Sequence, residues 1–244
     1  SALCESGLPV VLVVEPDVIE ADPVRADRFA ELDKSIQVIG RYGRMVLSPE
    51  EKWLLDRFNT HYRLEPAQMR ILADAYRREF LRTFGDAEFR SIVEFEGYIR
   101  FWMNVFAFGC PGVRRVAYLH NDMLKEFQVR FPYLRAIFAL YGQFDALVSV
   151  SETMAKVNAD SLAGRLGIDP SRFVHCDNII DVDSITEKSR EPLDQDLAEW
   201  TEGSFVLVNL GRLSPEKDQS KLIDAFAEVA GAAGDHVTEG APTS

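Results

Sequence analysis

Short apolar runs of strand length alternate with helix-type patterns along the first three quarters of the chain. The runs are Pro9–Val14, Ile36–Ile39, Ser91–Phe95, Arg115–Leu119, Asp145–Val150 and Phe173–Cys176. Between them lie stretches with an apolar residue every three or four positions, a spacing typical of amphipathic helices. This alternation predicts an α/β fold built around a largely parallel sheet.

Two helices carry clear boundary signals. The stretch Ser48-Pro-Glu-Glu51 offers a serine as N-cap, a proline at the first helical position and a glutamate that completes a capping box. The stretch Pro66–Phe84 repeats apolar residues at helical spacing, and Gly85 follows it as a stop signal. We therefore expect a helix that runs from Pro49 past Phe58 and a longer one over residues 66–84.

A further apolar run, Phe205–Leu210, stops at Gly211 and leads into a basic loop and an amphipathic helix. Backbone N–H groups and the dipole at the start of a helix attract phosphate, and Arg212 and Lys217 add full positive charge. The alternative is an ordinary helix start with two exposed basic side chains. We favour an anion site, because a similar Ser-Pro-Glu stretch earlier in the chain lacks the preceding strand.

Polar residues follow three of the predicted strands, at positions that line the ligand crevice of an open parallel sheet. His120 comes after Arg115–Leu119, and its imidazole can hydrogen-bond a phosphate or a sugar hydroxyl. A histidine that only satisfies the strand end is an equal alternative. Asp122 could act on an acceptor hydroxyl, but a helix N-cap is favoured. For Ser151 and Asn178 the local chemistry likewise favours a cap and a turn.

Composition and charge exclude several classes of function. The 244 residues include 39 acidic and 27 basic side chains, and the net charge of −12 argues against nucleic-acid binding and attraction to anionic lipid. No apolar run approaches the length of a membrane span. The cysteines Cys4, Cys110 and Cys176 form no paired motif, so we expect reduced thiols and a cytoplasmic protein.

The motifs follow one another in the order found in one enzyme family. A strand ending in His120, the segment VSVSE at 148–152, Asn178-Ile-Ile-Asp181 and GRLSPEK at 211–217 resemble the GT-B glycosyltransferases of family 4. The resemblance covers roughly residues 91–229. The stretches EFEGY, YLHNDM and HCDNIIDVD are similar to bacterial enzymes of teichoic-acid-type polymers in the cell envelope.

The resemblance implies two Rossmann-like domains. The N-terminal, acceptor-binding domain would have a parallel sheet with helices on both faces, and the C-terminal domain would bind the nucleotide sugar. On this basis we expect residues 1–180 to form the first domain and 181–203 an acidic connector with one short helix. Residues 204–230 would be the first βα unit of the second domain, and 231–244 a disordered tail.

The resemblance also implies an activity. A hexosyl group would pass from a nucleotide sugar, UDP-linked, to a cell-envelope polymer, a polyol phosphate or a lipid-linked acceptor. Transfer would retain the anomeric configuration and need no metal or other cofactor, and the enzyme could contact the inner face of the membrane peripherally. His120 matches the family's active-site histidine, and the donor diphosphate would be bound by Gly211, Arg212 and Lys217. The further candidates for the acceptor cleft are Asp122, Ser151 and Asn178.

The chain departs from the family pattern in three ways. Its Asn178-Ile-Ile-Asp181 lacks the usual glycine, and neither the Gly-rich loop after the first strand nor the second acidic motif of the donor domain is found. We therefore expect a fragment truncated at both ends, with weak or no transfer activity. Two alternatives stay open: glycerophosphate transfer from CDP-glycerol, and a non-catalytic nucleotide-binding or interaction module.

Overall fold

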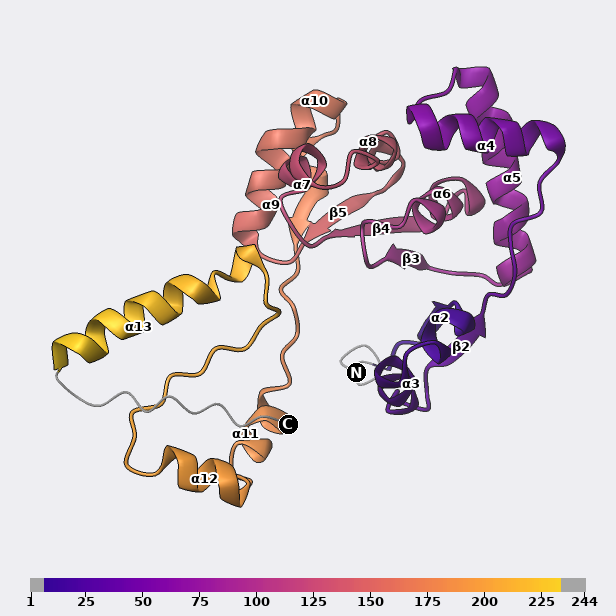
Figure 1. Cartoon of the computed structure of the whole chain (residues 1–244). Coiled ribbons are helices and arrows are strands. Elements are labelled where there is room, and N and C mark those ends of the chain that lie inside the picture. Colours follow the sequence, from indigo (N-terminus) through magenta and orange to yellow (C-terminus); the bar gives the residue numbers. More distant parts are fainter. Residues whose placement is uncertain (1–6, 234–244) are drawn as a thin grey trace. The chain divides into compact units, whose positions relative to one another are not determined.

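The structure is a computed structural model that describes residues 7–233 (Figure 1). The chain divides into two units between Ile179 and Ile180. Unit 1 contains all the strands of the described residues, and unit 2 contains helices and extended segments only.

Unit 1 is an α/β unit with two parallel sheets. The strand order is β1-β2 in the smaller sheet and β3-β4-β5-β6 in the larger one. The strands are β1 (Val11–Val14), β2 (Gln37–Gly40), β3 (Ser91–Glu94), β4 (Arg114–Leu119), β5 (Ala146–Ser149) and β6 (Phe173–His175). All six apolar runs predicted in this part of the chain form strands, and the predicted parallel sheet is confirmed.

The helices of unit 1 also follow the predicted pattern. They are α2 (Pro16–Glu20), α3 (Pro23–Ala30), α4 (Pro49–His61), α5 (Pro66–Phe84), α6 (Arg100–Gly109), α7 (Met123–Val129), α8 (Leu134–Phe138), α9 (Glu152–Asn158) and α10 (Gly164–Leu166). At the start of α4 the predicted capping box forms, because Ser48 and Glu51 each accept the other's backbone N–H. Helix α5 ends before Gly85, as predicted.

The core of unit 1 lies between the larger sheet and its crossover helices. Helix α6 contacts β3 and β4, and α9 contacts β5 and β6. Because the strand order is consecutive, right-handed crossovers bring these helices to one face, where Ala117, Leu119 and Leu147 are buried. The opposite face keeps Val93 46% and Val174 41% exposed. The α/β unit with a parallel sheet is thus shown, and the arrangement with helices on both faces remains what the resemblance implies.

A buried ion-pair network joins the end of β2 to α5. The Glu79 side chain is only 2% exposed, and it pairs with Arg41 at 2.9 Å and with Arg82 at 2.7 Å. The Arg41 guanidinium also lies 4.1 Å from the centre of the Phe101 ring. Burial acts to raise the pKa of Glu79, but the hydrogen bonds from Arg82 and Arg41 outweigh it and hold the pKa below its ordinary value.

Unit 2 differs from the prediction at its central element. Its helices are α11 (Val182–Lys188), α12 (Gln195–Thr201) and α13 (Gln219–Ala233), so the predicted connector has two short helices. The predicted strand Phe205–Leu210 does not form, because no neighbouring strand pairs with it among the described residues. Of the expected βα unit, the helix therefore forms and the strand does not. Of the predicted tail, residues 231–233 belong to α13, and residues 234–244 lie outside the described residues.

No helix in residues 7–233 is both long enough and apolar enough to cross a membrane.

Candidate functional site

The carboxyl ends of β3, β4, β5 and β6 meet at one edge of the larger sheet, because all four strands are parallel. We call this edge the carboxyl edge. In open parallel sheets, ligands bind in the crevice beyond it. His120 follows β4, Ser151 follows β5 and Asn178 follows β6, so each of them comes after the strand that the sequence predicted.

His120 is partly exposed, and its ring is held in a defined place. Its Nε2 atom hydrogen-bonds the carbonyl oxygen of Phe95, the first residue after β3. The ring centre lies 5.2 Å from that of Phe95 in an edge-on arrangement and 6.1 Å from that of Tyr118. One ring nitrogen, Nε2, therefore forms a hydrogen bond within the protein. The other, Nδ1, is available to a substrate.

Asp122 and Ser151 act as helix N-caps, and both cap predictions are confirmed. The Asp122 carboxylate accepts a hydrogen bond from the Lys125 N–H at 3.0 Å, at the start of α7. The Ser151 hydroxyl accepts one from the Met154 N–H at 3.2 Å, at the start of α9. These bonds satisfy backbone N–H groups at the starts of the two helices, and Asp122 adds a negative charge at the first of them.

Asn178 lies in an extended segment beyond β6, and its side chain is exposed. Asp181, the last residue of the Asn-Ile-Ile-Asp stretch, caps α11 by accepting the Ser184 N–H at 2.9 Å. The stretch therefore carries the chain out of unit 1 and starts the first helix of unit 2.

A buried asparagine, Asn158, ties the loop after β4 to the end of β5. Its amide nitrogen donates to the carbonyl oxygen of Asn121 at 3.0 Å and to the hydroxyl of Ser149 at 3.1 Å. Its amide oxygen accepts the Met123 N–H at 3.0 Å. Sequence reasoning missed this residue. The signal was a polar side chain on the inward face of an otherwise apolar helical segment.

Glu94 is the second residue that sequence reasoning missed. It is the last residue of β3, it is 3% exposed, and its carboxylate accepts the Gly97 N–H. Burial raises the pKa of Glu94 to about 7, although the bond from Gly97 acts to lower it. The signal in the sequence was a carboxyl group at the inward position of a strand that reads Ser-Ile-Val-Glu.

Tyr118 and Cys176 add two ionisable groups on the partly exposed face of the sheet. Burial raises the pKa of Tyr118 to about 12, and a hydrogen bond with the Cys176 thiol acts in the same direction. The thiol of Cys176 is exposed, whereas that of Cys110 is buried, and neither forms a disulfide. Cys4 lies outside the described residues.

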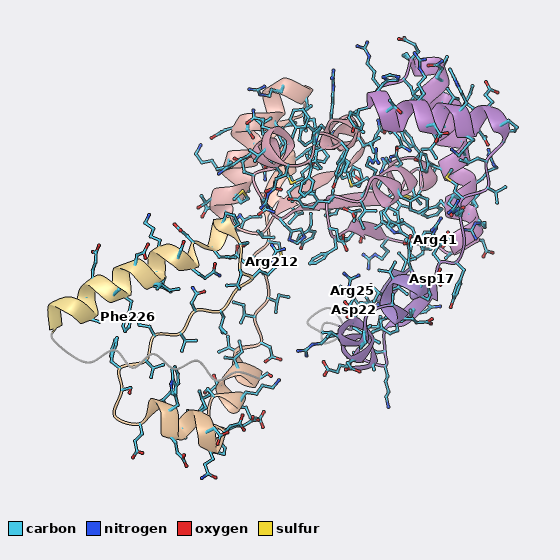
Figure 2. The ribbon with its side chains drawn as sticks, in the orientation of Figure 1. Asp17, Asp22, Arg25, Arg41, Arg212 and Phe226 are labelled. Atoms are coloured by element: carbon cyan, nitrogen blue, oxygen red, sulfur yellow. The ribbon has the colours of Figure 1, made fainter. Side chains whose placement is uncertain are left out.

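The predicted anion loop of unit 2 forms a compact turn before α13. The Lys217 N–H donates to the Ser214 carbonyl at 2.9 Å, and the Gln219 side chain donates to the Arg212 carbonyl at 2.8 Å. The Lys217 stem runs beside Gly211, where an added Cβ would lie 3.6 Å from it. Figure 2 shows Arg212 in the segment that leads into α13. The turn thus gathers Gly211, Arg212 and Lys217 in unit 2, while His120 belongs to unit 1.

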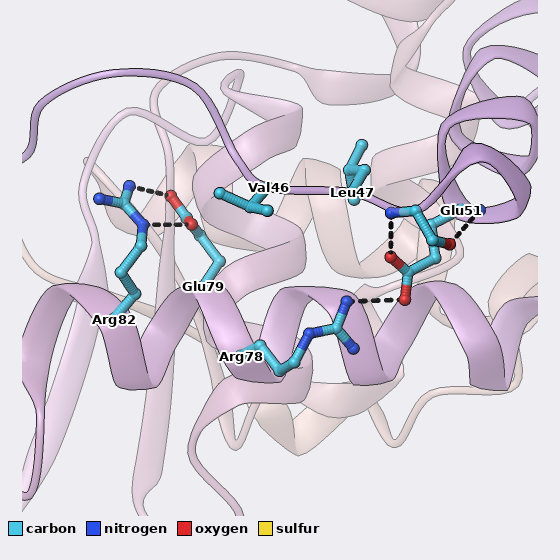
Figure 3. A pocket seen from close by; sticks show the side chains of 7 residues that line it. Val46, Leu47, Glu51, Arg78, Glu79 and Arg82 are labelled. Carbon is cyan, nitrogen blue, oxygen red and sulfur yellow. Dashed lines mark hydrogen bonds and ion pairs between the residues drawn. The ribbon is translucent and has the colours of Figure 1, made fainter.

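A hollow of about 540 Å³ lies between α4 and α5 (Figure 3). Glu51 and Glu79 lie on either side of Val46 and Leu47. The Arg78 guanidinium binds the Glu51 carboxylate at 2.7 Å, and Arg82 binds Glu79. Because these carboxylates are already matched by arginines and the hollow contains no residue of the carboxyl edge, we assign it to the packing of the two helices.

Unit 1 is thus an α/β unit whose parallel sheet carries polar side chains at its carboxyl edge. Comparison with models of known protein families and with curated proteins gave no match.

Proposed function

We propose that the protein is a glycosyltransferase of the GT-B type that takes a hexosyl group from a nucleotide sugar. The observation that carries this proposal is the place of His120. It follows the strand β4 of an all-parallel sheet, at the edge where such sheets bind ligands, and its ring is oriented before any substrate arrives. A group oriented in advance lowers the barrier without reorganising during the reaction.

In this proposal the acceptor binds at the carboxyl edge of unit 1. His120 contacts the transferred sugar or the acceptor hydroxyl through its remaining ring nitrogen. The starts of α7 and α9 lie at this edge, capped by Asp122 and Ser151. The proposed acceptor is a phosphorylated or polymeric envelope molecule, as the resemblance implies.

The donor binds at the anion loop of unit 2. Negative charge develops on the leaving diphosphate as its bond to the sugar breaks, so Arg212 and Lys217 would stabilise the transition state. The loop supports this role because Lys217 packs beside Gly211, within the same turn as Arg212. The same cations could also bind the diphosphate of CDP-glycerol. In that case the acceptor would attack a phosphorus atom and not a sugar carbon.

One observation favours a second candidate. The segment 205–210, which would anchor the loop in a donor domain, is unpaired in the described residues. A non-catalytic nucleotide-binding or interaction module would need only the loop. Both the glycosyltransferase and the non-catalytic module would bind the nucleotide, but only the glycosyltransferase would transfer a group from it.

The first test is calorimetric binding of UDP, a UDP-hexose and CDP-glycerol to the chain. We expect binding of the UDP-hexose, weakened at least tenfold in the double variant Arg212→Ala, Lys217→Ala. The matched control, Lys188→Ala with Arg190→Ala, removes the same charge from exposed positions of unit 2 and should bind as the wild type does. No binding of any of these nucleotides would refute both candidates.

The second test is transfer of labelled hexose to an envelope polymer. Transfer that is lost in His120→Ala, with nucleotide binding unchanged, is the result expected for the glycosyltransferase. Binding without any turnover agrees with the non-catalytic module and with the inactive fragment that the sequence predicts. If CDP-glycerol is turned over in preference, the transferred group is glycerophosphate and not a hexosyl group.

A further inference from the structure

The segment from Glu94 to Gly97 forms a tight turn that crosses the end of β4. Glu94 closes it from the buried side, because its Oε2 atom accepts the Gly97 N–H. Gly97 adopts φ of 73°, and a Cβ at this position would lie 2.2 Å from the carbonyl oxygen of Tyr118. The turn therefore lies directly against the β4 backbone, in a position that only glycine allows.

The same turn determines which ring nitrogen of His120 carries the proton. The Phe95 carbonyl, inside the turn, is bonded to His120 Nε2. A carbonyl oxygen can only accept, so Nε2 must donate, and in the neutral ring Nδ1 is then the acceptor. The Phe95 ring packs against Tyr118 at 4.9 Å and against His120, which holds the turn and the imidazole together.

The surroundings of Glu94 offer few other groups that could pair with its carboxylate. Glu96, in the turn, carries a like charge that acts to raise the pKa of Glu94. Tyr141, in the 3-10 turn Tyr141–Gln143, is fully buried, and its hydroxyl has no hydrogen-bond partner among the described residues. No cation is among the causes of the Glu94 shift. The partner of this buried carboxylate is thus the backbone of the turn itself.

We propose that Glu94 is a positioning residue for His120: through the Glu94–Gly97 turn it holds the Phe95 carbonyl in place, which fixes the Nε2–H tautomer. Nδ1 is then the ring atom that accepts a hydrogen bond from a substrate hydroxyl. The consequence for catalysis rests on the proposed function, whereas the tautomer itself does not.

The test is nitrogen-15 NMR of the His120 ring at pH 8, with its signals assigned by comparison with His120→Gln. The wild type should show Nε2–H with an unprotonated Nδ1. Glu94→Gln should keep this tautomer, because its amide oxygen can accept the Gly97 N–H, whereas Glu94→Leu should give a mixture of tautomers. In the transfer assay Glu94→Leu should lower kcat about tenfold to a hundredfold with little change in KM, and Glu94→Gln should restore it.

An Nδ1–H tautomer in the wild type would overturn the proposal, and this measurement does not depend on any Glu94 variant. A single Nε2–H tautomer in a folded Glu94→Leu protein would also overturn it. If the tautomers behave as expected but no variant, nor the wild type, transfers any group, the proposed function fails and the positioning role of Glu94 stands.

Discussion

Strand β5 and the segment 205–210 have similar sequences and opposite surroundings. Both are short apolar runs, Ala-Leu-Val-Ser in β5 and Phe-Val-Leu-Val-Asn-Leu in the segment. All four residues of β5 are buried, whereas Phe205 is 82% and Leu210 92% exposed. Strand β5 has β4 and β6 on its two sides, and the segment has no strand beside it in the described residues. An apolar run thus predicts a capacity for pairing, and the neighbours decide whether a strand forms.

The difference extends to the two units as wholes. Unit 1 has a continuous core that joins the larger sheet to α4, α5, α6 and α8. In unit 2 no side chain of the described residues is buried. Because burial of apolar area is the main favourable term in folding, we expect substitutions to matter in unit 1 and to have little effect on stability in unit 2.

The largest contrast is expected between ion pairs. Glu79→Ala leaves the buried Arg41 without its main partner and should lower the free energy of unfolding by about 4 kcal/mol. The exposed pair of Lys221 with Asp218 in unit 2 provides the comparison. Lys221→Ala should change the free energy of unfolding by less than about 0.5 kcal/mol. Urea unfolding followed by tryptophan fluorescence measures both, because Trp102 lies in unit 1 and Trp200 in unit 2. Equal losses in the two variants would contradict the contrast between the units.

The next contrast uses one substitution in both apolar runs. Leu147→Ala in β5 should cost about 3 kcal/mol, because it removes a fully buried side chain and leaves a cavity. Leu207→Ala in the unpaired segment should cost less than about 0.5 kcal/mol. A loss of several kcal/mol for Leu207→Ala in the same urea experiment would show that the segment is covered in solution.

The smallest contrast concerns pH. The pKa of Glu94 is raised from 4.5 to about 7, so in this window the native state holds a proton that the unfolded chain has released. The free energy of unfolding of the wild type should therefore fall as the pH rises from about 4.5 to 7, by about 2 to 3 kcal/mol.

Glu94→Gln removes this titration, so its stability relative to the wild type should rise over the same window. Asp196→Asn in unit 2, at an exposed position, serves as the control and should leave stability within about 0.5 kcal/mol of the wild type. A difference between Glu94→Gln and the wild type that stays constant with pH would rule out a buried titrating carboxyl at this position.

Most of unit 1 could be predicted from the sequence because its signals are local. The capping box at Ser48, the stop at Gly85 and the caps at Asp122 and Ser151 depend on residues four positions apart or fewer. The sequence could not show that Phe205–Leu210 stays unpaired, because strand pairing depends on distant segments.

The hydrogen bonds between polar residues of the site were harder to predict, because they too depend on distant segments. Asn158 binds a carbonyl 37 positions away, and His120 binds one 25 positions away. Such bonds join elements that only the folded sheet brings together. The predicted position of His120 was correct, but the groups that orient it appear only in the structure.

Two glycines with positive φ differ in how much substitution each can tolerate. At Gly112, with φ of 84°, an added Cβ would meet nothing within 4 Å, so asparagine is an acceptable replacement. At Gly97 every other residue meets the Tyr118 carbonyl as well as an unfavourable φ. Random mutagenesis followed by selection for a folded chain should therefore yield variants at position 112 and return only glycine at position 97. The identity of that one residue is set by a neighbouring strand and not by its own loop.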